Sequence, residues 1–363
     1  MILKLFLFWR IGLFLVTYLG SITLPKVANT GVGAIAPGRD FNFWLSWAQW
    51  DGGHYLDISN HWYTKSTDFA FFPLFPFTVK LFGQLLGENY LLSGLLISNV
   101  SFVLFLFVFY KLVKQKFSQK VASFTVTTFL VFPTTFFASA LYSEALFLLI
   151  VVLAFRFLNE KKFLFASVCA SLASLTRLVG VLLTISIVYS YLANIKFNLR
   201  KMDKYTLHII ISFFGFTVYC LYLFAKFRDP FKFLTSQSFW QRQISDPVST
   251  IAFYIWRVAT EGSLPLNVYF DLGLTLLFLT LLVFGIKKIP SSLWIFSTLV
   301  ILIPASSGTL TSMPRYLLSS LGTFIILGIF FENKFALRVC IWTASLIAQA
   351  ILATLFVNGY WIA

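Results

Sequence analysis

Long apolar stretches that recur along the chain constrain its fold more than any other feature. A helix crosses the hydrocarbon core of a bilayer with about 20 mostly apolar residues, and residues 91–110 and 206–225 are two such stretches. Hydrophobic residues make up 59% of the 363 residues and charged residues 11%, which is far from the composition of a soluble domain. The sequence therefore predicts an all-α polytopic membrane protein.

Length and periodicity divide the apolar sequence into about 10–12 transmembrane helices. The first stretch carries Lys4 and Arg10 near its start and lacks a small-residue cleavage site, which favours an uncleaved anchor over a signal peptide. Residues 248–262 are expected to form a re-entrant or surface helix. Because no repeat or soluble appendage is visible, we expect one membrane domain over residues 1–363. The expected spans are residues 2–24, 91–110, 121–138, 142–158, 163–176, 179–195, 205–225, 265–286, 291–304, 315–331 and 335–357.

The distribution of charge predicts which way the chain faces. With the N-terminus in the cytoplasm, the cytoplasmic segments hold 17 of the 28 basic residues, Arg10 and Lys204 among them, and three of the 13 acidic residues. This asymmetry follows the positive-inside rule and explains the net charge of +15 without nucleic acid. Most of the other acidic residues lie in two expected extracytoplasmic loops, residues 25–90 and 226–264, so we expect the chemistry to face outward.

The first expected loop carries a dense mixture of aromatic and ionisable side chains. Aromatic residues at this density are typical of helices that lie in the membrane interface, and anchoring the loop there is the alternative to a functional role. Asp51 precedes two glycines, with His54 at i+3 and Tyr55 at i+4 on the same helix face. Since an apolar surrounding raises the proton affinity of a carboxylate, Asp51 is our candidate for a general base. The mixture comprises Trp44, Trp47, Trp50, Tyr55 and Trp62 with Asp40, Asp51, His54, Asp57 and His61.

Two further segments could contact a substrate. In residues 69–77 (FAFFPLFPF), two prolines interrupt regular helix and would hold aromatic rings in a loop that could guide a lipid tail. Residues 132–149 place Tyr142, Ser143 and Glu144 at an outer turn, where Glu144 begins a helix. The carboxylate of Glu144 either complements the helix dipole or contacts substrate.

Three arginines are expected within or next to apolar sequence near the outer surface: Arg177, Arg242 and Arg315. A guanidinium there is costly unless it pairs with a carboxylate or a phosphate. For Arg177 the alternatives are a pair with Glu144 and a grip on a phosphate. Together with Tyr316, the arginines indicate a site for an anionic lipid headgroup.

Other classes of chemistry lack their signatures. The chain has no GxxxxGK[ST], HExxH, GxSxG or EF-hand pattern, which argues against nucleotide hydrolysis, zinc proteolysis and serine-hydrolase chemistry. The cysteines lie in apolar segments without a CxxC pair, so neither a metal site nor a disulfide framework is expected. They are Cys169, Cys220 and Cys340.

Several short motifs, taken in order, resemble the PIG-V-type mannosyltransferases, that is, GPI mannosyltransferase 2 and its bacterial relatives. They are WDGGHYLDI, FFPLFP, YSEALFLL, TRLVG, SMPRYLL and GYWIA, and they run from Trp50 to Ala363. The resemblance implies a membrane glycosyltransferase of the GT-C superfamily. Such an enzyme moves a sugar, here mannose, from a polyprenyl-phosphate donor to an extracytoplasmic lipid or glycan acceptor, with inversion at the anomeric carbon.

The resemblance also implies roles for individual residues. Asp51 would be the base, with His54 and Tyr55 beside it, and Glu144, Arg177 and Arg315 would contact acceptor and donor phosphate. Tyr142, Arg242 and Tyr316 complete the predicted substrate-binding set. A divalent metal could share the phosphate, although no residue is assigned to bind one.

The chain departs from the family pattern at two positions, with Trp62 where glycine is usual and Leu178 where proline is usual. The first departure bears on loop shape and the second on how firmly Arg177 is placed. The chain lacks the long extra loops of eukaryotic members, which favours a bacterial plasma-membrane protein. A transporter or lipid flippase is the alternative, but it would need ionisable groups near the bilayer midplane. A non-catalytic scaffold is the third hypothesis.

Overall fold

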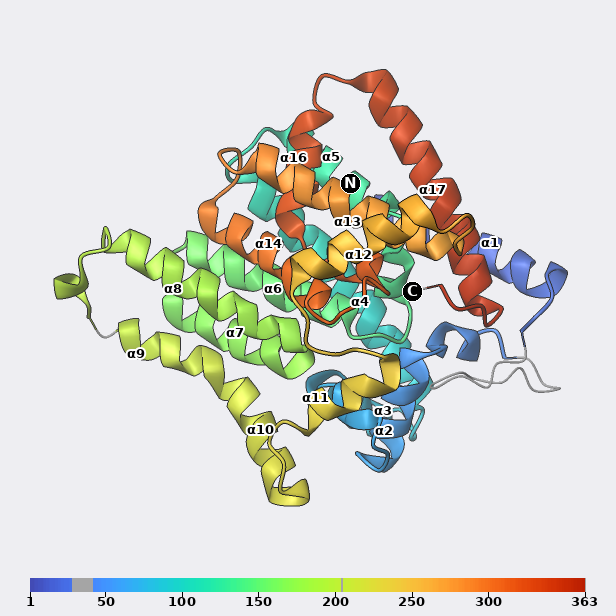
Figure 1. Cartoon of the computed structure of the whole chain (residues 1–363), viewed down its shortest axis with the longest axis horizontal. Coiled ribbons are helices and arrows are strands. Elements are labelled where there is room, and N and C mark those ends of the chain that lie inside the picture. Colours follow the sequence, from blue (N-terminus) through green and yellow to red (C-terminus); the bar gives the residue numbers. More distant parts are fainter. Residues whose placement is uncertain (28–41, 204, 363) are drawn as a thin grey trace. The chain divides into compact units, whose positions relative to one another are not determined.

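The computed structural model describes residues 1–27, 42–203 and 205–362, and their regular secondary structure is entirely helical (Figure 1). Asp40 and Lys204, which entered the sequence analysis, lie outside these residues. Among the described residues, five helices are long and apolar enough to cross a membrane, and four more are apolar but shorter. The five are Ile2–Thr23, Tyr90–Lys114, Tyr205–Phe227, Leu266–Gly285 and Phe335–Val357, and the shorter ones are Phe163–Thr176, Leu178–Asn194, Ser291–Ala305 and Leu321–Phe330. The predicted helical membrane fold is confirmed.

Two predicted spans are interrupted in the structure. The span predicted over 121–138 is α5 (Gln119–Val131) followed by the short 3-10 helix η3 (Thr135–Ser139). Pro133 explains the break, because the residue before a proline is biased away from helical backbone and Phe132 is extended. The span predicted over 315–331 is two helices, α15 (Met313–Leu317) and α16 (Leu321–Phe330).

The chain packs into two compact units. Unit 1 comprises residues 1–64, 74–149 and 327–362, and unit 2 comprises residues 65–73 and 150–326. The single membrane domain that the sequence predicts stays a prediction.

Unit 1 brings both ends of the chain together. Its helices are α1 (Ile2–Thr23), α2 (Asp51–His61), α3 (Leu74–Leu85), α4 (Tyr90–Lys114), α5 and α17 (Phe335–Val357), with the start of α6 (Glu144–Asn159) and the end of α16. Helix α1 lies beside α17, blue against red in Figure 1, and the two pack closely at Gly20 and Thr354. The amide of Asn358 donates to the Gly20 carbonyl at 3.2 Å, which ties the end of α17 to α1.

Unit 1 shows the surroundings of Arg10, a residue counted among the expected cytoplasmic charges. Arg10 lies within α1, in agreement with the expected first span over residues 2–24, and its Nε donates to Asn99 Oδ1 of α4 at 3.1 Å. The guanidinium also lies over the ring of Trp47, 4.7 Å from the ring centroid. The residues next to Arg10 in the sequence are apolar and do not show which polar groups of other segments pack against it. The sequence alone therefore could not predict the contacts with Asn99 and Trp47.

Gln349 of α17 joins three segments of unit 1. Its side chain is buried, accepts a hydrogen bond from Trp9 Nε1 at 2.7 Å, and donates to the carbonyls of Leu130 and Phe132. Replacing Gln349 with leucine should lower the free energy of unfolding by about 1–2 kcal/mol, because these buried groups lose their partners. Thermal unfolding in detergent measures the change. Thr343→Val, at an exposed position of the same helix, should leave stability unchanged.

Unit 2 is built around α7 (Phe163–Thr176), α8 (Leu182–Asn194), α10 (Phe214–Phe227), α13 (Leu266–Gly285) and α14 (Ser291–Ala305). Gly180 and Gly215 pack directly on the backbone of α7, where a side chain would clash. Around this core lie shorter pieces: η2 (Asp68–Ala70), η4 (Leu178–Val181), η5 (Leu199–Lys201), α9 (Tyr205–Ile210), η6 (Ile211–Phe213), α11 (Lys232–Ser236), η7 (Gln237–Trp240), α12 (Pro247–Thr260) and α15. Helix α12 corresponds to the helix expected over 248–262, and Asp246 caps its first turn.

Candidate active site

In unit 1, Asp51 is the first residue of α2 and is half-buried. The preceding residue, Trp50, has a φ of 57°, a conformation that costs a non-glycine residue about 1–3 kcal/mol. Trp50 is held by Trp361, with ring centroids 4.8 Å apart, and by a hydrogen bond from its Nε1 to the Tyr360 carbonyl at 3.3 Å. The end of the chain therefore fixes the turn that presents Asp51.

The segment before α6 lies against α2. A methyl group on Gly52 would lie 3.2 Å from the carbonyl oxygen of Leu141, so only glycine permits this approach without a shift. The Tyr142 hydroxyl donates to the Gln49 carbonyl at 2.8 Å, and the Tyr55 hydroxyl donates to Ser143 Oγ at 2.8 Å. These bonds join the two segments that carry the predicted acids of unit 1.

The predicted site residues of unit 1 are thus brought together on α2 and the neighbouring turn. Glu144 begins α6 and is 3% exposed, and His54 of α2 is also buried. The hydroxyls of Tyr55 and Tyr142 are used in the bonds between the segments, which gives them a structural role in this fold. Their predicted contact with substrate stays a prediction.

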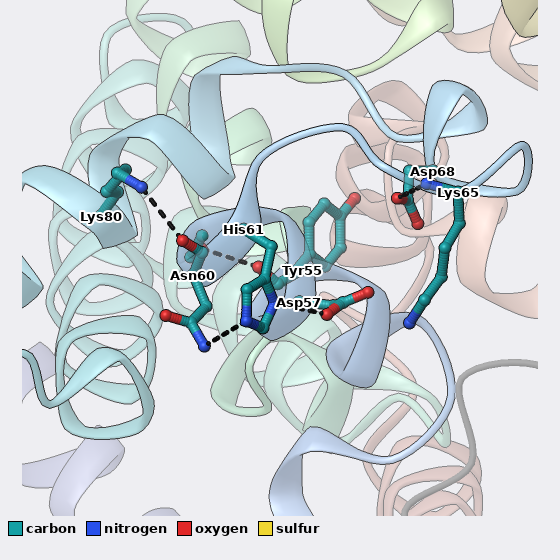
Figure 2. A network of polar contacts seen from close by, with 8 residues as sticks. Tyr55, Asp57, Asn60, His61, Lys65, Asp68 and Lys80 are labelled. Atoms are coloured by element: carbon teal, nitrogen blue, oxygen red, sulfur yellow. Dashed lines mark hydrogen bonds and ion pairs between the residues drawn. The ribbon is translucent and has the colours of Figure 1, made fainter.

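The far end of α2 carries a second polar network (Figure 2). His61 Nδ1 lies 2.9 Å from Asp57 Oδ1, and Asn60 Nδ2 lies 3.1 Å from His61 Nε2. Lys80 of α3 donates to the Asn60 carbonyl at 3.2 Å. Because Asp57 pairs with His61 one turn away, this network anchors the end of α2, and we assign it no catalytic role.

Both departures from the family pattern leave the backbone in the form that the usual residue would favour. Trp62, which ends α2, has a φ of 65°, a value that glycine adopts readily. Arg177 has φ −153° and ψ 147°, the extended form that a following proline would impose. The substitutions therefore change neither the backbone at the end of α2 nor the break after α7.

In unit 2, two predicted arginines flank one aromatic ring. The guanidinium carbon of Arg177 lies 5.4 Å from the centroid of the Tyr316 ring, and that of Arg242 lies 5.3 Å from the same centroid. Arg242 also donates to the Tyr316 hydroxyl and to the Thr311 carbonyl, both at 3.1 Å. Arg177 follows α7, Arg242 follows η7, and Tyr316 belongs to α15. Residues far apart in sequence thus form one cationic cluster. Arg315 is next to Tyr316 in the chain, and its side chain is buried.

A tight loop after α14 supports this cluster. Gln243 and Ser245 make backbone hydrogen bonds to the carbonyls of Ser307 and Ser306. The Tyr254 hydroxyl of α12 lies 2.9 Å from Thr309 Oγ1, which in turn lies 2.8 Å from Thr311 Oγ1. The loop thereby holds the chain that follows Arg242 and positions the Thr311 carbonyl that Arg242 contacts.

The sequence reasoning missed several supporting contacts. Trp361, Tyr360 and Ser143 were read as parts of motifs, but the structure places them directly on Trp50 and Tyr55. The terminal GYWIA motif was the signal, since an aromatic motif at a chain end can serve to fix another segment. Within the described parts of the chain, no three His, Cys, Asp or Glu side chains gather as metal ligands.

Two solved structures have a fold similar to that of this chain. The ArnT structure from Cupriavidus metallidurans bound to undecaprenyl phosphate has a TM-score of 0.55 and 13% identity, over 95% of this chain and 63% of that one. The oligosaccharyltransferase of Archaeoglobus fulgidus in the apo form has a TM-score of 0.55 and 12% identity, over 98% of this chain and 56% of that one. The chain thus spans less than two thirds of each of these proteins. It has the GT-C glycosyltransferase fold.

The sequence comparison narrows this class. The family described as Mannosyltransferase (PIG-V) matches residues 2–327. The chain therefore belongs to the PIG-V mannosyltransferase family, and it is an integral multi-pass membrane protein. A search of curated proteins finds no match to the chain.

Proposed function

We propose that this protein transfers mannose from a polyprenyl-phosphate donor to a lipid or glycan acceptor on the extracytoplasmic side of a bacterial plasma membrane. The observation that carries the proposal is the carboxylate of Asp51, placed by a strained turn at the head of α2 in a chain of the PIG-V family. The basic excess of the expected cytoplasmic segments supports the orientation, with the N-terminus inside.

A polyprenyl-phosphate donor is supported by the fold and by the basic cluster of unit 2. The ArnT structure, which has a similar fold at 13% identity, is bound to undecaprenyl phosphate. Arg177 and Arg242 flank Tyr316, and Arg315 follows in α15. Guanidinium groups bind phosphate oxygens with charge-assisted hydrogen bonds, so this cluster suits a lipid-linked phosphate.

The proposed reaction is a single displacement with inversion. Asp51 accepts the proton of the acceptor hydroxyl as its oxygen attacks the anomeric carbon. The bond from that carbon to the phosphate oxygen breaks, and polyprenyl phosphate leaves with the electron pair. Arg177 and Arg315 stabilise the charge that grows on the phosphate. A divalent cation that bound the same phosphate would act in the same sense.

Transfer by the purified wild-type protein in liposomes tests the proposal. Mannose and glucose, each radiolabelled, are offered on polyprenyl phosphate, and mannose is also offered as a nucleotide-linked donor, with mixed bacterial lipids and glycans as acceptors. Label should move from polyprenyl-phosphate mannose and not from the nucleotide donor. Transfer from the nucleotide donor alone would contradict the donor class. No transfer from any donor would favour a transporter or a scaffold.

A further inference from the structure

We infer that Arg10 is a positioning residue for transfer: from inside the membrane it fixes the segment that presents Asp51. This inference rests on the proposed function. Arg10 lies within α1, a helix long and apolar enough to cross a membrane, about 12 Å along the axis from Ile2 and about 20 Å from Thr23 at 1.5 Å per residue. A cation at this depth is costly, which makes a functional role the default hypothesis.

The described surroundings of Arg10 are neutral. Its Nε donates to the amide oxygen of Asn99 at 3.1 Å, and its guanidinium stacks over the Trp47 ring at 4.7 Å. Among residues 1–27, 42–203 and 205–362, no carboxylate pairs with Arg10, and its Nη1 is buried without a hydrogen-bond acceptor. The hydrogen bond and the stacking contact of Arg10 hold Asn99 and Trp47 in place.

The first of the two residues that Arg10 contacts, Trp47, lies close to Asp51 in the sequence. Trp47 belongs to η1 (Leu45–Ala48), four residues before Asp51, and its side chain is fully buried. The carbonyl of Trp47 accepts a hydrogen bond from the Leu141 amide at 3.0 Å. Trp47 is therefore clamped between the guanidinium of Arg10 and the backbone of the turn before α6, and it anchors the residues that lead into α2.

The second residue that Arg10 contacts, Asn99, holds the turn before Glu144. The amide nitrogen of Asn99 donates to the Ser139 carbonyl at 3.2 Å, and the neighbouring Ser98 donates to the Tyr142 carbonyl at 3.2 Å. These bonds hold the turn that precedes α6 against α4. Arg10 orients the amide of Asn99 by donating a hydrogen bond to its oxygen. The same cation therefore fixes both the segment that carries Asp51 and the segment that carries Glu144.

Misplacement of a catalytic group by about 1 Å from a remote change can lower a rate by about 10²-fold. Replacing Arg10 with methionine should therefore lower kcat by about 10²-fold while KM for the donor changes by less than about threefold. Lysine cannot stack and hydrogen-bond as arginine does, so Arg10→Lys should lower kcat by about tenfold. Lys4→Met, an exposed cation on the same helix, controls for loss of charge and should match wild type.

Two further measurements complete the experiment: the energetic coupling between Arg10 and Asn99, and the hydrogen exchange of the backbone amides. Asn99→Leu should lower kcat to a similar extent, and the double variant with Arg10→Met should be no slower than the slower single variant, because Asn99 acts only while Arg10 orients its amide. Hydrogen exchange of residues 45–52 should rise in Arg10→Met and not in Lys4→Met, and this measurement needs no activity. If Arg10→Met does not fold, the kcat of Arg10→Lys tests the inference instead.

The inference is overturned if folded Arg10→Met or Arg10→Lys retains wild-type kcat, or if the exchange of residues 45–52 does not change. A variant that loses thermal stability but keeps kcat would also overturn it, since that is a purely structural role. A wild-type protein that transfers no sugar from any donor contradicts the proposed function instead, and the exchange measurement then still reports whether Arg10 holds the segment.

Discussion

Replacing Asp51 with asparagine is expected to lower kcat for sugar transfer by about 10³-fold, because asparagine keeps the shape of the side chain but cannot accept the acceptor's proton. KM for the lipid-linked donor should change little, since the base contacts the acceptor and not the phosphate. Steady-state transfer with purified protein in liposomes measures both constants. The start of α2 should stay intact, because an asparagine is tolerated at the head of a helix.

A matched control lies on the same helix. Asp57 pairs with His61 at 2.9 Å on α2, so Asp57→Asn removes a carboxylate from α2 without touching the proposed base. We expect Asp57→Asn to retain wild-type kcat. If Asp51→Asn is as active as wild type while folded, Asp51 is not the base. Equal losses in both variants would indicate a general effect on α2.

The second large effect is expected at Arg177. Arg177→Gln should lower kcat by about 10²-fold, because a guanidinium that stabilises a leaving phosphate contributes mainly in the transition state. The Tyr316 ring loses one of its two flanking cations in this variant, but the Arg242 bonds to Tyr316 and Thr311 should keep the cluster folded. Transfer kinetics at saturating donor measure kcat, and thermal unfolding checks the fold.

Arg257 provides the control for Arg177. It lies on α12 in the same unit and makes two hydrogen bonds to Glu261, at 2.8 and 3.0 Å. The hydrogen bond to Arg257 lowers the pKa of the Glu261 carboxyl. Arg257 is therefore paired with a carboxylate at the end of its own helix and has no proposed role on the phosphate. Arg257→Gln should leave kcat unchanged. An unchanged kcat in Arg177→Gln would rule out the proposed role of Arg177 on the phosphate.

Hydropathy predicted the helical membrane fold well, because an apolar run of fixed length is a property of the sequence itself. The last span, residues 335–357, has the same bounds in the structure. Predictions failed where a local interruption or a tertiary contact decides. Pro133 ends α5 early, and no local pattern showed that Arg10, within the predicted first span, contacts the amide of Asn99 and the ring of Trp47.

The candidate site could be predicted in its residue types but not in its contacts. The spacing placed Asp51, His54 and Tyr55 on one helix, which is a local property that periodicity reveals. No local pattern shows that Arg177 and Arg242 flank one ring, or that Trp361 packs on Trp50, because these pairs are distant in sequence. Only the fold brings them together.

The central claim is that sugar moves alone while phosphate stays on the lipid, and a doubly labelled donor tests it most directly. Polyprenyl-phosphate mannose carrying ¹⁴C in the sugar and ³²P in the phosphate is incubated with wild-type protein and with Asp51→Asn. The account predicts that ¹⁴C appears in the acceptor, that one ³²P-labelled polyprenyl phosphate is released for each sugar moved, and that Asp51→Asn does neither. Transfer of both labels together, or equal transfer by Asp51→Asn, would contradict it.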